Sequence, residues 1–190
     1  MIDILPFFCS EVKMRKVILY IAQSLDGKIA DSTGSVSWLG GESPDYTGDY
    51  GYSKLIKDID TVLLGYRTYH QIVSELSPGS WPYPEQNCFV FTHHPLPDEP
   101  SIHFLSESPE VFVRRLAEQP GKNIWVCGGA KLISSLVCSD CIDEYWIATM
   151  PILLGEGIPL FSYLPSSLSL HLEEVTSENG VILSRYSCKR

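Results

Sequence analysis

Short apolar runs alternate with amphipathic segments along most of the chain. Each run is rich in β-branched or aromatic residues and is bounded by turn-forming residues, which is typical of buried β-strands. The runs predict strands at Val17–Gln23, Thr61–Leu64, Asn87–Thr92, Ile102–Leu105, Ile124–Cys127 and Ile142–Met150.

The segments between these runs carry helix signals. A serine followed by proline, which favours a helix N-terminus, occurs at Ser43-Pro44 and again at Ser108-Pro109. The first signal predicts a helix that runs towards Asp60, and the second predicts a helix that ends at Pro120-Gly121. Shorter helices are predicted at Tyr66–Ser74 and Ala130–Val137.

The end of the chain has a different pattern. Two apolar runs, Leu168–Val175 and Val181–Cys188, flank Asn179-Gly180, a dipeptide that favours a hairpin turn. Strands that alternate with helices need crossover connections and so form a mostly parallel sheet, to which the hairpin adds an antiparallel edge. We therefore predict an α/β fold with one mixed, mostly parallel sheet and helices on both faces, and loops at residues 24–41 and 81–84.

The composition fits one globular domain. The chain has 190 residues, of which 44% are hydrophobic and 19% charged, which is enough to form a core. We assign residues 14–190 to this domain and residues 1–13 to an N-terminal extension. The net charge of −9 disfavours nucleic acid and anionic membranes as partners, and no apolar run is long enough to span a bilayer.

The 6 cysteines are scattered through the sequence and do not have the spacing of a disulfide framework. This pattern predicts a cytoplasmic protein with reduced thiols. Cys138 and Cys141 have the spacing of half a zinc site, but no second pair or nearby histidine accompanies them, so we expect no metal.

Three junctions between a strand and a helix carry the candidate chemistry: Gly65, Thr92 and Gly128-Gly129. In an open α/β sheet, ligands bind beyond the carboxyl ends of the strands, where helix N-termini suit phosphate groups. The glycine pair would let a pyrophosphate approach the main chain, although a single Gly-Gly turn also has a purely structural explanation. No G-x-G-x-x-G motif follows the first strand, so the sequence does not indicate a Rossmann fold.

Several motifs together resemble one known superfamily. They are SLDGKIA (24–30), TGSVSWLGG (33–41), DTVLLGYRTY (60–69), CFVFT (88–92), VCGGAKLI (126–133) and PILLGEGIPLF (151–161). The chain resembles the dihydrofolate reductase-like superfamily, in the branch of the reductase domain of the riboflavin-biosynthesis deaminase/reductase. The resemblance implies a dihydrofolate reductase-like fold with a central mixed sheet of about eight strands.

The same resemblance implies an activity and partners. The implied enzyme is an NADPH-dependent reductase of the dihydrofolate reductase or 5-amino-6-(5-phosphoribosylamino)uracil reductase kind. It would transfer a hydride to a small-molecule substrate, an unsaturated heterocycle of pyrimidine-like or pterin-like shape, and would often be a homodimer.

The resemblance also implies the residues of the cofactor site. Ala22 and Ile29 would flank the nicotinamide. The other positions would face phosphate groups: Gly65, Arg67 and Thr68, then Thr92 and His93 near the 2′-phosphate, and Gly128 and Gly129 with Ala130, Lys131 and Leu132 at the pyrophosphate. A Cβ at position 129 is therefore expected to weaken NADPH binding while the fold stays intact.

The substrate candidates are Asp26, Lys28, Trp38, Asp45, Asp49 and Cys127. Asp26 is also explained as a turn residue before Gly27, Lys28 as a solvated loop residue, and Trp38 as a cap on the core. A carboxylate at the start of the first helix, as at Asp45 and Asp49, stabilises a helix without any ligand. We expect Asp49 and Lys28 to take part in catalysis by orienting the substrate, while water supplies the proton.

Two features separate the chain from the riboflavin-pathway enzymes. Cys127 stands where those reductases commonly have a glutamate before the glycine pair, and 190 residues are expected to leave no space for their deaminase half. The leading hypothesis remains an NADPH-dependent oxidoreductase. The alternatives are a nucleotide-binding protein of the same fold without catalytic activity, and an interaction module in which the glycine turn is only structural.

Overall fold

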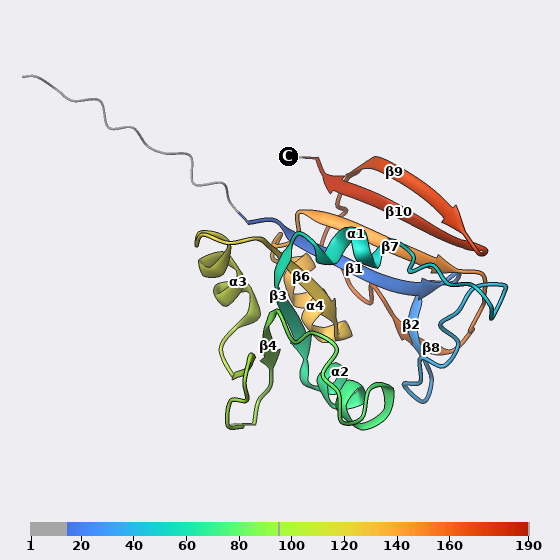
Figure 1. Cartoon of the computed structure of the whole chain (residues 1–190). Helices are drawn as coiled ribbons and strands as arrows, with labels where there is room; N and C mark the ends of the chain where they lie inside the picture. The colour runs from blue at the N-terminus through green and yellow to red at the C-terminus, as the bar shows by residue number, and fades with distance from the viewer. Residues whose placement is uncertain (1–14, 95, 190) are drawn as a thin grey trace, which may run out of the picture.

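The computed structural model describes residues 15–94 and 96–189, so the predicted extension at residues 1–13 lies outside the described residues. An eight-stranded sheet with the order β5-β4-β3-β6-β1-β7-β10-β9 forms its centre (Figure 1). All neighbouring pairs from β5 to β7 are parallel, and β10 is antiparallel to both β7 and β9. The strands are β1 (Val17–Ser24), β3 (Ile59–Gly65), β4 (Asn87–Phe91), β5 (Ile102–Leu105), β6 (Asn123–Gly128), β7 (Glu144–Met150), β9 (Leu170–Glu178) and β10 (Val181–Cys188). The predicted mixed sheet with a final antiparallel hairpin is confirmed.

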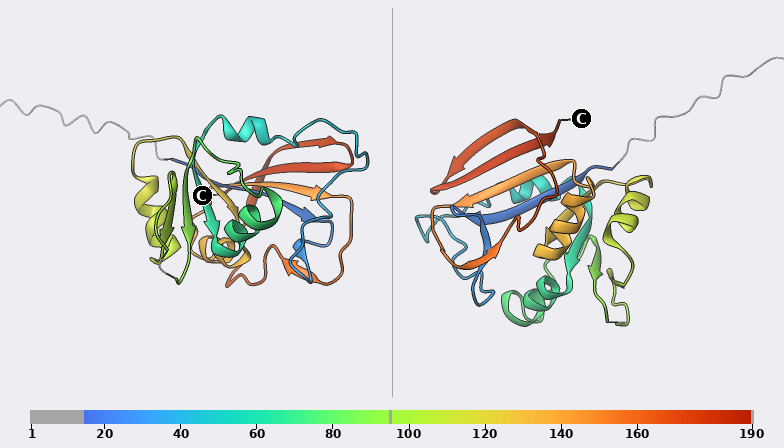
Figure 2. Two further views of the ribbon diagram at one scale, coloured as in Figure 1. Left: turned by 60° about the horizontal axis from the view of Figure 1, so that its bottom comes forward. Right: turned by 180° about the vertical axis from the view of Figure 1, so that it is seen from behind.

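Helices cover the two faces of this sheet (Figure 2). One face carries α3 (Pro109–Ala117) and α4 (Ala130–Cys138). The other carries α1 (Tyr52–Ile56) and α2 (Tyr66–Gln71), and α2 continues as a π-helical turn, η1 (Ile72–Leu76). This turn ends two residues beyond the helix predicted at Tyr66–Ser74.

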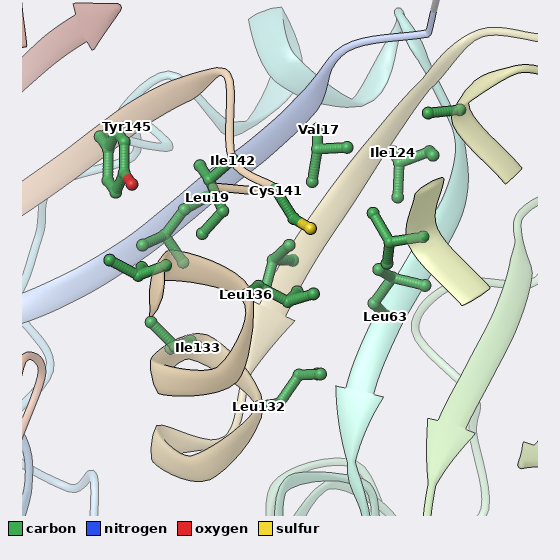
Figure 3. Packing of buried hydrophobic residues seen from close by; sticks show 14 of the residues in the cluster. Val17, Leu19, Leu63, Ile124, Leu132, Ile133, Leu136, Cys141, Ile142 and Tyr145 are labelled. Carbon is green, nitrogen blue, oxygen red and sulfur yellow. The ribbon is translucent and has the colours of Figure 1, made fainter. Parts of the chain in front are cut away.

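The core below α4 is aliphatic. Leu132, Ile133 and Leu136 of α4 point towards Leu19 of β1 and Leu63 of β3 (Figure 3). These residues recur at helical spacing in the sequence, so one face of α4 is apolar and is buried. Burial of each such side chain stabilises the fold by about 1.5–3 kcal/mol, and this layer fixes α4 against the ends of β3 and β6.

The core on the opposite face is rich in aromatic rings. Trp125 of β6 lies at its centre, with edge contacts to the rings of Tyr20, Tyr52 and Tyr83 at centroid distances of 6.1, 5.9 and 5.2 Å. The indole Nε1–H of Trp125 donates to the main-chain oxygen of Tyr20 at 3.0 Å. Since the polar atom of the buried ring is satisfied, the cluster joins β1, β6 and α1 without an energetic penalty.

The helix predicted from Ser43 towards Asp60 is wrong over most of its length. Only Tyr52–Ile56 is helical, because Tyr50 and Gly51 have φ of +52° and +87°, in the left-handed region that a helix cannot include. The loop before Tyr50 is bound to the β9–β10 hairpin and does not form helical hydrogen bonds at Glu42: the main-chain N–H of Glu42 donates to the main-chain oxygen of Asn179 at 3.0 Å.

The loop predicted at residues 24–41 contains a short strand. β2 (Lys28–Asp31) pairs with β8 (Gly157–Pro159) in a separate two-stranded sheet beside the end of β1 (Figure 1). The partner strand lies more than 120 positions away, so local sequence does not reveal the pairing. The hairpin strand β9 also differs from its prediction, since it begins at Leu170 and extends to Glu178.

Candidate active site

The carboxyl ends of β3 and β6 meet backbone to backbone. The register pairs Leu63 with Val126 and Leu64 with Gly128, so Cys127 is an extra residue that bulges out of the strand. Gly129 then adopts φ +107°, and a Cβ there would lie 3.2 Å from both the nitrogen and the Cα of Gly65. The strand junction itself therefore favours glycine at position 129, and a side chain there is expected to strain the fold as well as to affect ligand binding.

This glycine junction is also lined by main-chain donors. Gly65 and Gly129 are the N-caps of α2 and α4, and within the described residues neither helix has a side-chain cap. The first N–H groups of a helix lack intrahelical partners and carry a partial positive charge. A bare glycine surface next to such donors fits a phosphate group.

Of the predicted residues on α4, Ala130 is half-buried and Lys131 is exposed. Leu132 is 5% exposed and packs in the aliphatic core, so its side chain faces away from any ligand. Thr68 lies on the other side of the junction, where its methyl group would be 3.3 Å from a Cβ at Gly128. Only the main chain at position 132 is available to a pyrophosphate.

An arginine and a histidine follow the ends of the neighbouring strands β3 and β4. Arg67 on α2 and His93 after β4 are both exposed. Gly65 pairs with Phe91 in neighbouring parallel strands, so the residues that follow these strands leave the sheet at the same edge. Thr92 is buried, and its Oγ1 accepts the N–H of His94 at 3.1 Å, which makes it part of the turn.

A cavity of about 210 Å³ opens near the carboxyl ends of β1 and β7, on the α1 and α2 face of the sheet. Ala22 pairs with Ala148 across these strands, so the two small side chains form its floor. The lining residues are Tyr20, Ala22, Ala148 and Met150 from the strands, and Leu39, Gly40 and Tyr50 from the loop before α1. The predicted nicotinamide residue Ala22 therefore lies in a cavity, whereas Ile29 packs towards the aliphatic core on the other face.

The loop wall of this cavity is fixed by Asn179 at the tip of the β9–β10 hairpin. Its Oδ1 accepts the N–H of Ser43 at 2.8 Å, and its Nδ2 donates to the oxygen of Ser43 at 3.2 Å and to the hydroxyl of Tyr50 at 2.9 Å. The hydroxyl of Tyr20 donates to the main-chain oxygen of Tyr50 at 3.2 Å. Burial raises the pKa of Tyr20, so this phenol stays neutral and its proton is held within the wall.

Asp26 has a structural position. Its carboxylate accepts hydrogen bonds from Ser24 Oγ at 2.6 Å and from the main-chain N–H groups of Leu154 and Gly155 at 3.0 and 2.8 Å. The hydrogen bond from Ser24, followed by those from the main chain, lowers the pKa of Asp26 to about 2. These contacts join the end of β1 to the turn at residues 151–156, as expected of a turn residue. The main-chain N–H of Lys28 donates to Ser24 Oγ at 2.9 Å in the same turn.

Asp49 caps α1 from three residues before the helix. Its carboxylate accepts the N–H of Ser53 at 2.8 Å and that of Gly51 at 3.1 Å. The hydrogen bonds from Ser53 are the main cause of the lowered pKa of Asp49, so this residue is a carboxylate at neutral pH. It lines a second cleft, of about 270 Å³, beside β9 and β10.

Three predicted substrate residues are not among the residues that line the first cavity. Asp45 is exposed, and its N–H donates to Ser43 Oγ at 3.3 Å in the loop before α1. Trp38 packs against the aromatic core, and its Nε1–H donates to the oxygen of Ser35 at 3.2 Å. Cys127 lies 3.5 Å from the Tyr83 hydroxyl, and burial raises the pKa of its thiol to about 12, so it is neutral.

Sequence reasoning missed most of the cavity wall. Tyr20 has a local signal, because it lies two positions before Ala22 in a strand and therefore shares its face. Ala148 and Met150 require the strand order. Asn179 requires the contact between the hairpin tip and a loop far away in the sequence.

Residues 15–183 match the family described as the RibD C-terminal domain. The chain belongs to this family. It is similar to the uncharacterized protein YwjB of Bacillus subtilis (strain 168), with 43% identity over 84% of this chain and 90% of the relative.

Two solved structures are similar to this chain in fold. A candidate riboflavin biosynthesis protein from Shewanella sp. PV-4 has a TM-score of 0.81 and 30% identity over 92% of this chain and 99% of its own. Dihydrofolate reductase from Enterococcus faecalis, complexed with NADP(H), has a TM-score of 0.64 and 16% identity over 92% of this chain and 97% of its own. This second likeness supports the predicted dihydrofolate reductase-like fold. In the part of the chain that the structure describes, no helix has the length and apolar character needed to cross a membrane.

Proposed function

We propose that this protein is an NADPH-dependent reductase that transfers a hydride to a small, flat, unsaturated heterocycle, here called the acceptor. One observation carries the proposal: the glycine junction lies at the carboxyl ends of β3 and β6, and β6 is the neighbour of β1, which contributes Ala22 to the apolar cavity. A phosphate site and an apolar ring site on adjacent strand ends suit a nicotinamide dinucleotide with a second ring beside it.

Different residues of the chain would bind different groups of the cofactor. The N-terminus of α4, with Gly128 and Gly129, would hold the pyrophosphate, and Arg67 with His93 would hold the 2′-phosphate. The added charge of a phosphate on the ribose requires such cations on a protein with a net charge of −9. The apolar floor at Ala22 would exclude water from the nicotinamide.

The bound nicotinamide supplies a hydride, and the acceptor must gain a proton as well. One unsaturated bond of the acceptor would then become a single bond, with NADP⁺ as the other product. Asp49 is held as a carboxylate, and the protons of Tyr20 and Cys127 are held by burial. None of the three is a ready acid near neutral pH, which supports water as the proton source.

The same observation supports the second candidate, a nucleotide-binding protein of this fold that does not catalyse reduction. Among the described residues that line the cavity, none has a carboxyl, imidazole or ammonium group. Turnover separates the candidates, because both bind NADPH and only the reductase oxidises it.

We also propose that the protein is a cytoplasmic homodimer. Leu172 and Val175 of β9 and Ile182 of β10 are 49%, 52% and 47% exposed, and their cross-strand partners in the register place them on the face that continues from α4. Uncharged sheet surface of this kind suits a second copy of a chain that carries a net charge of −9. Sedimentation should give a dimer for the wild type and a smaller species for Ile182→Glu.

The test of function is direct. The protein is incubated with NADPH and a panel of pterins, pyrimidines and quinones, and loss of the reduced-nicotinamide absorbance is followed. We expect NADPH to bind and at least one flat acceptor to be reduced. NADPH binding without turnover on any acceptor would favour the second candidate, and absence of binding would overturn both.

A further inference from the structure

We infer that the acceptor carries no phosphate or other anionic group: it is a neutral or cationic flat ring. The inference rests on the proposed function, because it concerns the molecule that would accept the hydride. It goes beyond that function by excluding acceptors of the phosphoribosyl kind. The argument depends on three charge features of the cavity and its surroundings.

The first feature is the wall of the cavity. Among its described lining residues, none is charged. The hydroxyl of Tyr20 donates to the main-chain oxygen of Tyr50, and the hydroxyl of Tyr50 accepts a hydrogen bond from Asn179. The remaining surface consists of Ala22, where the nicotinamide would lie, and of Leu39, Gly40, Ala148 and Met150, which are left to the acceptor. This surface suits the face of an uncharged ring and offers no donor array to an anion.

The second feature is the charge of the loop that forms one side of the cavity. Residues 29–53 contain no lysine, arginine or histidine, whereas Asp31, Glu42, Asp45 and Asp49 are all acidic. The lowered pKa of Asp49 keeps its carboxylate ionised. A substituent that leaves the cavity along this loop therefore enters a region of negative charge.

The third feature is the adjoining cleft, where the cations already have partners. Lys54 and Arg185 both form ion pairs with Glu174, at 2.9 and 2.6 Å. Arg185 also stacks over the ring of Trp146 at 4.1 Å. Within residues 15–94 and 96–189, neither Asp49 nor Glu178 of the same cleft forms an ion pair, so an added phosphate would meet two carboxylates that have no cationic partner.

The cations that remain near the strand ends have other positions. Arg67 and His93 follow β3 and β4, where the proposed function uses them for the cofactor, and Lys131 lies in the first turn of α4 at the proposed pyrophosphate site. Lys28 lies in β2, which pairs with β8 outside the main sheet, and it is not a lining residue of the cavity. A phosphate bound through Lys28 is the competing possibility, and the experiment includes it.

The experiment compares matched ligands that differ by one phosphate. Riboflavin and flavin mononucleotide serve as one pair, and uridine with its 5′-monophosphate as the other, with protein saturated with NADP⁺. We expect the phosphorylated member of each pair to bind at least tenfold more weakly, and the difference to shrink at high salt because screening reduces repulsion. Equal or tighter binding of the phosphorylated members would overturn the inference, and so would failure of both neutral members to bind while NADP⁺ binds.

Three variants locate the effect. Glu178→Gln should reduce the difference between the paired ligands about two- to threefold, and Glu173→Gln on the same strand should leave it unchanged, since Glu173 accepts a hydrogen bond from Ser187 outside the cleft. Lys28→Met should weaken both members of a pair equally. A selective loss of the phosphorylated ligand in Lys28→Met would show a phosphate site and contradict the inference. Failure of the proposed function is a separate result, because it would appear as absent NADPH binding or oxidation.

Discussion

The two parts of the candidate site, the glycine junction and the apolar cavity, differ in the atoms that form their surfaces. At the carboxyl ends of β3 and β6, the surface is main chain: Gly65 and Gly129 approach so closely that a Cβ on Gly129 would make a tight contact of 3.2 Å with Gly65. At the cavity beside β1 and β7, the surface is side chain, and one wall is an irregular loop held by Asn179. The first half is fixed by strand pairing and the second by a few polar contacts.

This difference bears on what each half can do. A backbone surface with helix N-terminal donors recognises a group common to many molecules, such as a phosphate, and it cannot vary without disrupting the sheet. A wall of side chains on a loop can change while the fold is kept. We therefore expect variants at the junction to affect stability and cofactor binding, and variants at the loop to affect the acceptor.

The largest effect is expected from Gly129→Ala. The substitution imposes a strained backbone at φ +107° and brings Cβ to 3.2 Å from Gly65. We expect the free energy of unfolding to fall by roughly 2–4 kcal/mol, measured by denaturant titration. Gly155→Ala is the matched control, because Gly155 also has positive φ, +75°, but has no neighbour within 4 Å of its Cβ position. Equal losses in the two variants would show that the approach to Gly65 does not matter.

A smaller effect, on binding alone, is expected from Arg67→Ala. The wild type should prefer NADPH to NADH, and loss of a charge-assisted contact should weaken NADPH binding by roughly 1.5–3 kcal/mol, with little change for NADH. Calorimetry measures both. Arg115→Ala removes an equal charge from α3, where Arg115 pairs with Glu107, and should leave the preference unchanged. Equal affinity of the wild type for both cofactors would contradict the proposed 2′-phosphate site.

The sequence predicted the junction well because its signals are local. Apolar runs gave the strands, and the glycine pair marked the turn into α4. The signal Ser108-Pro109 likewise predicted the start of α3 correctly, at Pro109. The resemblance to the dihydrofolate reductase-like superfamily then predicted the fold, a central mixed sheet of about eight strands, and this fold is confirmed.

The same signal failed at Ser43-Pro44 for a physical reason. Ser43 donates and accepts hydrogen bonds with the side chain of Asn179 instead of starting a helix, so a tertiary contact overrides the local preference. The cavity wall follows from that contact, and nothing near Ser43 in the sequence indicates it. For this reason Tyr50, Leu39 and Gly40 could not be predicted, whereas the junction could.

Asn179→Gly tests the role of the loop that forms one wall of the cavity. Glycine keeps the positive φ of +50° at this turn and removes the amide that holds Ser43 and Tyr50. We expect the dissociation constant of a flat ligand such as riboflavin to rise about tenfold, as for the loss of roughly 1–1.5 kcal/mol of hydrogen bonding, while NADPH binding stays unchanged. Ser177→Ala, on the same strand, is the control. A parallel loss of NADPH binding would show that the two halves are not independent.

The smallest effects are expected on the reduction step itself. An ammonium must be desolvated to act as an acid near neutral pH, and the carboxylate of Asp49 has a lowered pKa because of its hydrogen bonds to Ser53. A carboxyl with a depressed pKa is protonated only at acidic pH, so the rate should be flat from about pH 5 to pH 9 if water is the donor. Asp49→Asn and Lys28→Met should therefore raise the dissociation constant of the acceptor more than they slow the step. The measurement is single turnover with saturating NADPH and the acceptor found in the panel. A loss of about 10³-fold in the step, with binding preserved, would show that the substituted residue is the acid.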